Sequence, residues 1–154
     1  MIEVSMKILV LSMLTMLIGA ATFAETCPIL SGQFECEGTS KEFSGTVQIG
    51  QNGIKYYLPF VSNPQFRETY LFIADNRPRV HKEKNSHTGE MTVIKKAQCK
   101  GNVLVTDSAI KEINYLLRST YALDVKTKKI AVNDTYFQDN KLVASFYSLC
   151  KPIK

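Results

Sequence analysis

Residues 43–60 are the stretch that most limits how this chain can fold. Two segments in which apolar and polar residues alternate, 44–49 and 54–60, meet at Asn52 and Gly53. Asn-Gly between alternating segments is a strong hairpin signal, because both central residues of a type I′ turn need a positive φ. A lone hairpin is marginal in water, so other strands must extend it and cover its apolar face. The sequence therefore predicts a β-sheet protein.

Short β-prone segments continue along the rest of the chain and are separated mostly by tight turns. The longest regular segment is 115–126, and Asp139 with Asn140 marks the last hairpin turn. Residues 107–113 fit either one short helix or a bent strand. Connections this short force antiparallel pairing. We predict an all-β fold, an antiparallel up-and-down meander of about eight or nine strands that closes into a small barrel, with a β-sandwich as the alternative.

The N-terminus has the features of a secretory signal peptide, which we assign to residues 1–24. Lys7 precedes an apolar run at 8–18, and small residues then lead to Ala24. This run is shorter than the roughly 20 apolar residues that cross a bilayer. We expect cleavage after Ala24 or Ala21, with no stable membrane span afterwards. Residues 25–154 are then a single domain that is secreted or periplasmic.

All four cysteines, Cys27, Cys36, Cys99 and Cys150, lie in the part that we expect to be exported. An even number in an oxidising compartment predicts two disulfides, for which three pairings exist. We favour Cys27 with Cys150 and Cys36 with Cys99, because a bridge between the chain ends closes a large loop. No Cys-x-x-Cys pair is present, so we predict neither a metal site nor a cofactor.

The sequence offers few residues for catalysis. His81 and His87 are the only histidines, and solvent exposure explains both in a charged, turn-rich region. We interpret Asp134 and Asp139 as turn residues and not as a pair of catalytic carboxylates. No motif for nucleophilic or phosphate chemistry occurs. We therefore predict no catalytic residues and a protein that is not an enzyme but acts by binding.

The net charge of +5 is modest and does not predict a nucleic-acid partner. Basic residues gather at 77–84 and again at Lys95, Lys96 and Lys100. We interpret both groups as solvated strand ends and loop, since such charges commonly protect the edges of sheets, with an anion site as the alternative.

A barrel of about eight strands holds either packed side chains or one small ligand. We predict a small apolar or amphipathic ligand inside this barrel. The alternative is an envelope or secreted protein-interaction module, such as a hydrolase inhibitor, in which side chains fill the interior. The inward residues that we expect to contact a ligand are Phe34, Tyr56, Leu58, Phe72, Leu117, Tyr121 and Phe146.

The entry segment 30–34 is similar to the opening of lipocalin barrels, where a glycine precedes an aromatic residue by one position. Here these residues are Gly32 and Phe34, and lipocalins have tryptophan at the position of Phe34. Residues 133–136 resemble the second lipocalin motif of threonine, aspartate and an aromatic residue. This resemblance implies a β-barrel that carries a small apolar ligand.

A second resemblance is to periplasmic β-barrel lysozyme inhibitors. Their strands open with an aromatic-x-Cys segment like Phe34 to Cys36, and they also carry a disulfide. Their Ser-Gly-rich inhibitory loop is not recognisable in this chain. The resemblance implies a protein partner in the cell envelope.

Overall fold

A computed structural model describes residues 26–39, 44–59, 69–85 and 89–153, which form ten strands. The strands are β1 (Gly32–Gly38), β2 (Gly45–Asn52), β3 (Lys55–Pro59), β4 (Thr69–Ile73), β5 (Arg79–Asn85), β6 (Gly89–Lys100), β7 (Val103–Ile110), β8 (Tyr115–Leu123), β9 (Ile130–Gln138) and β10 (Lys141–Pro152). The predicted all-β, up-and-down fold is confirmed, with ten strands and not eight or nine. The proposed signal peptide, residues 1–24, lies outside the described residues.

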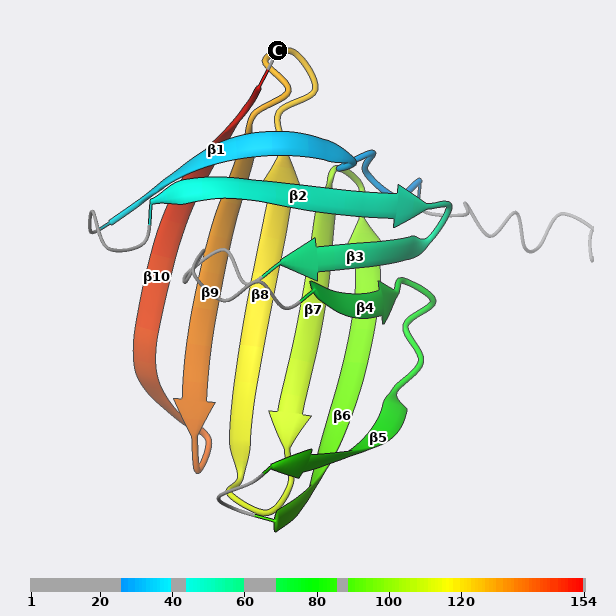
Figure 1. The fold of residues 1–154 in the computed structure, drawn as a ribbon, viewed down its shortest axis with the longest axis vertical. Helices are drawn as coiled ribbons and strands as arrows, with labels where there is room; N and C mark the ends of the chain where they lie inside the picture. Colours follow the sequence, from blue (N-terminus) through cyan, green and yellow to red (C-terminus); the bar gives the residue numbers. More distant parts are fainter. Residues whose placement is uncertain (1–25, 40–43, 60–68, 86–88, 154) are drawn as a thin grey trace, which may run out of the picture.

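The strands form one curled antiparallel sheet in the order β4-β3-β2-β1-β10-β9-β8-β7-β6-β5. The long strands β6 to β10 make a curved wall, and β1 to β4 cross in front of its upper part (Figure 1). β1 pairs with both β2 and β10, so the first and last strands are joined. β4 and β5 are the two edges of the sheet. The molecule is therefore a half-barrel that is open between β4 and β5, two strands that follow each other in sequence.

The hairpin expected within residues 43–60 is present, but its turn comes one residue later than predicted. β2 ends at Asn52 and β3 begins at its register partner Lys55, so Gly53 and Ile54 form the loop. Gly53 has a φ of 58°, the positive value that a type II′ turn needs at its first central position. The last hairpin turn agrees with the prediction.

That last turn joins β9 to β10 through Asp139 and Asn140, which follow the register pair Gln138 and Lys141. Their φ angles are 50° and 62°. Both are positive, as a type I′ turn requires. Asx residues tolerate this conformation better than most others.

Residues 107–110 continue strand β7, so the bent-strand alternative is right and the helix is not formed. Ser108 and Ile110 face the same side as Thr106, and β7 pairs with β6 and β8 along its length. These ladder hydrogen bonds and the inward side chains stabilise the extended form over a short helix. The described residues contain no helix that is long and apolar enough to cross a membrane.

The core lies between the upper wall and the layer of β1 to β3. Its largest fully buried side chains include Tyr56, Leu30, Ile49, Leu58 and Leu104. Fully burying a large aliphatic side chain stabilises a fold by about 1.5–3 kcal/mol. Packing of this cluster therefore holds the crossing strands onto the wall.

The structure contains two disulfides, but the favoured pairing was wrong. Cys36 pairs with Cys150 and Cys27 pairs with Cys99. Because β1 and β10 are neighbours, Cys36 and Cys150 are register partners with Cα atoms 3.9 Å apart. Cys27 precedes β1 and lies instead beside the end of β6. Because Cys36 on β1 and Cys150 on β10 form one bridge, Cys27 and Cys99 form the other.

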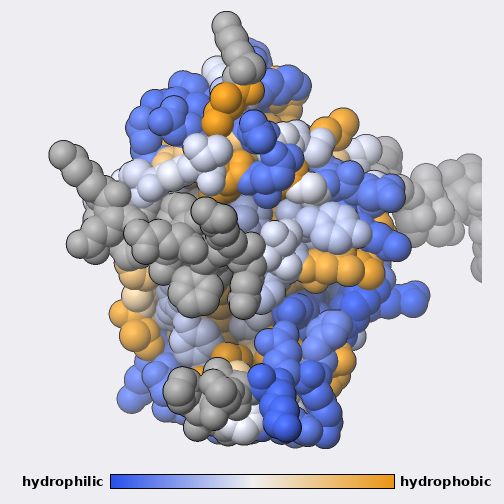
Figure 2. Space-filling view, viewed as in Figure 1, coloured by the Kyte–Doolittle hydropathy of each residue, from blue (hydrophilic) through white to orange (hydrophobic). Residues whose placement is uncertain are grey.

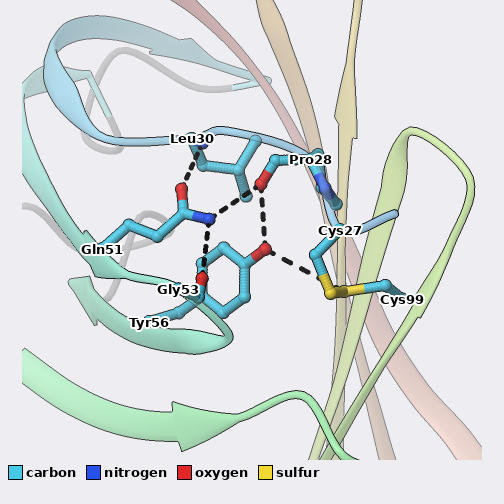
Figure 3. The surroundings of a disulfide bond; sticks show 7 residues. All are labelled: Cys27, Pro28, Leu30, Gln51, Gly53, Tyr56 and Cys99. Atoms are coloured by element: carbon cyan, nitrogen blue, oxygen red, sulfur yellow. Dashed lines mark hydrogen bonds between the residues drawn. A yellow bond between two sulfur atoms is a disulfide. The ribbon is translucent and has the colours of Figure 1, made fainter. Parts of the chain in front are cut away.

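A hydrogen-bonded cluster holds the segment before β1 against β2 and β3 (Figure 3). The Tyr56 hydroxyl donates to the Pro28 carbonyl at 2.8 Å and lies 3.9 Å from the Cys99 sulfur. The Gln51 amide donates to the same carbonyl at 3.1 Å and accepts from the Leu30 N–H at 2.7 Å. The chain entry, the first hairpin and the Cys27–Cys99 bridge therefore form one unit.

Candidate ligand cavity

A cavity of about 280 Å³ lies on the concave face, between β3 and β4 on one side and β6 to β8 on the other. Its apolar and aromatic lining includes Leu58, Tyr70, Phe72, Val93, Leu117 and Tyr121. The volume is slightly below the usual range for small-molecule sites, which begins at roughly 300 Å³. In the same view as the ribbon, the surface over β5 is mainly hydrophilic, and hydrophobic residues lie beside it at the level of β4 (Figure 2).

A row of buried polar side chains, which we call the polar row, crosses the wall at one level. Thr106, Ser119 and Asp134 are register partners on β7, β8 and β9. Their exposed fractions are 3%, 5% and 4%. Thr106 and Ser119 line the cavity. Polar groups are costly to bury unless they form hydrogen bonds, so this row marks a polar level on the otherwise largely apolar concave face of the half-barrel.

The polar row also corrects the interpretation of Asp134 as a turn residue. Asp134 lies within β9 with its side chain on the concave face, because it is the register partner of Ser119 and of Phe146 on β10. Asp139 does lie in the turn after β9. The period-two alternation of Val132, Asp134 and Tyr136 carried this information, but the neighbouring turn residues obscured it.

Two tyrosines of the cavity wall keep their protons across the physiological pH range. Burial strongly raises the pKa of Tyr121, and the nearby Asp134 carboxylate acts in the same direction. Burial likewise raises the pKa of Tyr115, with a further contribution from Asp134. Both phenols are therefore neutral groups that can donate a hydrogen bond inside the cavity.

Lys95 extends into the cavity from β6 and is largely buried, with a side-chain exposure of 13%. Its Nζ lies 3.2 Å from a carboxylate oxygen of Glu83 and 5.0 Å from the centre of the Tyr70 ring. The interpretation of Lys95 as a solvated strand end was therefore wrong. The sequence did contain a signal for the inward position of Lys95. Val93, Lys95 and Ala97 follow the period of two along the strand, which puts all three residues on the inner face.

Four of the predicted ligand contacts, Leu58, Phe72, Leu117 and Tyr121, do line the cavity. The other three face inward elsewhere. Phe34 and Tyr56 belong to the packed core, and Phe146 packs edge-on against Tyr136 with ring centres 5.5 Å apart. A ligand-binding role for all seven stays a prediction. Sequence reasoning missed Tyr70, Glu83, Lys95 and the cavity hydroxyls of Thr106, Ser108 and Ser119.

The histidines do not contribute to the cavity as far as the structure describes them. His81 is exposed on β5, and His87 lies outside the described residues. Within residues 26–39, 44–59, 69–85 and 89–153, no three histidine, cysteine, aspartate or glutamate side chains are grouped so that they could hold a metal ion.

The half-barrel and its cavity define an all-β protein with a cavity on the concave face of a curled ten-stranded sheet. No protein-family model matches the chain, and neither the search of curated proteins nor the search of solved structures finds a match. The resemblances to lipocalins and to lysozyme inhibitors therefore stay predictions.

Proposed function

We propose that this protein binds a small amphipathic molecule in the cavity of the half-barrel and acts by binding without catalysing a reaction. Two disulfides fit an extracellular or periplasmic place of action. Such a protein carries, stores or removes a molecule that has both an apolar part and a polar group.

The observation that carries this proposal is the division of the concave face into a filled part and a hollow part. Around Tyr56 and Ile49 the interior is packed with fully buried side chains. At the polar row and beyond it, a cavity of about 280 Å³ remains, with apolar walls and several polar groups that converge on it. Ligand sites typically combine these two features.

The edge strands give this cavity a route to solvent. β4 and β5 are adjacent in sequence, yet they form opposite edges of the sheet. The cavity is lined by residues next to that opening, including Tyr70 on β4 and Glu83 on β5. A ligand can therefore enter without breaking any ladder between paired strands.

The test compares a variant that fills the cavity with one on the opposite face of the same strand. Leu117→Trp places a large ring in the cavity, whereas Leu116→Trp lies on the outer face of β8, because neighbouring residues of a strand point to opposite faces. We expect the neutral fluorophore phenylnaphthylamine to bind the natural protein and Leu116→Trp, and to lose binding to Leu117→Trp.

Thermal unfolding of both variants checks that each is folded, and native mass spectrometry of gently purified protein reports any retained ligand. Equal fluorophore binding by both tryptophan variants would place the site elsewhere. Absence of both fluorophore binding and a retained ligand would overturn the proposal.

A second candidate function is binding of a protein partner through the outer surface. It is favoured by a separate hollow of about 550 Å³ near the chain entry. Three apolar residues that line it are exposed, Ile29 by 75%, Val125 by 51% and Ile153 by 45%. A stoichiometric partner that is retained by Leu117→Trp and lost in Ile29→Asp would favour this function over ligand carriage.

A further inference from the structure

The polar groups of the cavity carry information about the ligand beyond its apolar part. Lys95 lies on β6, which is paired on both sides, with β5 and β7. Its ammonium group is held near the Tyr70 ring and is shielded from most solvent. A cation in such a place needs an anion, because burial removes most of its hydration.

In this structure the anion is the carboxylate of Glu83, which is held much less firmly than Lys95. Glu83 belongs to β5, an edge strand that pairs only with β6. Its side chain is 45% exposed, compared with 13% for Lys95. The cation is therefore fixed in the cavity, whereas a change of side-chain rotamer can move its anion into water.

A neighbouring cation, Arg79, already has a complete partner. Arg79, the register partner of Lys95 on β5, donates two hydrogen bonds to Asp75 at 2.9 and 2.6 Å. Bidentate pairs of this kind are among the stronger charged contacts in proteins. Lys95 is thus the cavity cation whose anion can be exchanged.

We infer that the ligand is an anionic amphiphile whose carboxylate replaces that of Glu83 on the Nζ of Lys95. This inference rests on the proposed function of the same cavity. Ser108, the register partner of Lys95 on β7, also lines the cavity, so its hydroxyl is placed to donate to the same carboxylate. The apolar part of the ligand lies against Val93 and Leu117.

Charge explains why a carboxylate is selected. A ligand carboxylate keeps the cavity neutral while the carboxylate of Glu83, whose side chain is already 45% exposed, moves into water. A cationic head group is repelled by Lys95. A neutral head group must leave the pair of Lys95 and Glu83 in place and gains no charged contact.

The test uses octanoate and octanol, which share a chain length and differ in head group, with calorimetric titration of the disulfide-intact full chain. Lys95→Met should weaken octanoate binding by about tenfold or more, since a charge-assisted hydrogen bond is lost. Octanol binding should change by less than about threefold, because it does not use this contact. Glu83→Gln should tighten octanoate binding by about fivefold, because a charged competitor is removed.

Lys82→Met and Glu90→Gln are matched controls, because this nearby ion pair has side-chain exposures of 70% and 62%. Both should leave octanoate binding unchanged. Octanol binding as strong as that of octanoate, with no effect of either Lys95→Met or Glu83→Gln, would overturn the inference and leave the cavity function intact. Failure of both compounds and of phenylnaphthylamine to bind would overturn the cavity function itself. If Lys95→Met does not fold, Glu83→Gln still tests the inference, because it should bind octanoate more tightly than the natural protein does.

Discussion

Replacing Tyr56 by phenylalanine tests how the chain entry is attached to the half-barrel. The Tyr56 side chain is fully buried, and its hydroxyl donates to the Pro28 carbonyl at 2.8 Å. A hydrogen bond of this type contributes about 1 kcal/mol to the free energy of unfolding. Phenylalanine keeps the ring, and the Pro28 carbonyl still accepts from Gln51. We therefore expect a loss of about 1 kcal/mol near pH 8.

The loss should shrink at high pH, because burial raises the pKa of Tyr56 to about 12 from the ordinary value of 10.0. Well below pH 10 the hydroxyl is protonated in both the folded and the unfolded chain. As the pH rises from 10 towards 12, the unfolded chain releases this proton first, so the natural protein loses stability. Each pKa unit corresponds to about 1.4 kcal/mol, which is enough to cancel the advantage of the hydroxyl near pH 11.

Urea unfolding of the disulfide-intact proteins at pH 8 and near pH 11 measures both effects. Tyr57→Phe is the matched control, since Tyr57 is the next residue on β3 and is 42% exposed. We expect this control to follow the natural protein at both pH values. The reasoning is refuted if Tyr56→Phe and Tyr57→Phe lose equal stability, or if the difference at Tyr56 grows as the pH rises.

Two further changes test the backbone framework by urea unfolding. Alanine at both Cys36 and Cys150 removes a bridge of sequence separation 114. The chain-entropy model predicts that the free energy of unfolding falls by about 5 kcal/mol. A fall of less than about 1 kcal/mol would contradict that model here. Gly32→Ala should cost about 1–3 kcal/mol, because Gly32 has a φ of 147° and an added Cβ would lie 3.3 Å from the Phe34 ring. Gly53→Ala should cost less, since nothing lies within 4 Å of its added Cβ, although its φ is also positive; equal losses would contradict a steric role for Phe34.

Local patterns predicted the strands well because they depend on neighbouring residues. Alternation along 115–123 placed Leu117 and Tyr121 on the inner face, as the register of β8 confirms. Turn chemistry placed the last hairpin at Asp139 and Asn140. At the first hairpin, Gly53 fits either a I′ or a II′ turn, so the register remained uncertain by one residue.

Properties that depend on distant pairing were not accessible from the sequence. The disulfide pairing follows from the register between β1 and β10, which places Cys36 opposite Cys150. The opening of the sheet follows from the separation of β4 from β5, and no local pattern encodes it. Lys95 was misplaced because its charge was given more weight than its position in the period of two.

The concave face serves two needs that compete for the same strands. Stability requires apolar side chains in close contact, whereas a ligand requires space and polar groups that are available to it. The two needs meet at the polar row, because Tyr121, one level nearer the core than Ser119, belongs to the core cluster and also lines the cavity. Lys95 lies one level on the other side of the row, in the cavity. A single strand such as β8 therefore contributes Tyr121 to the core cluster and Leu117 to the cavity wall, and the register of its ladders sets the level of each side chain.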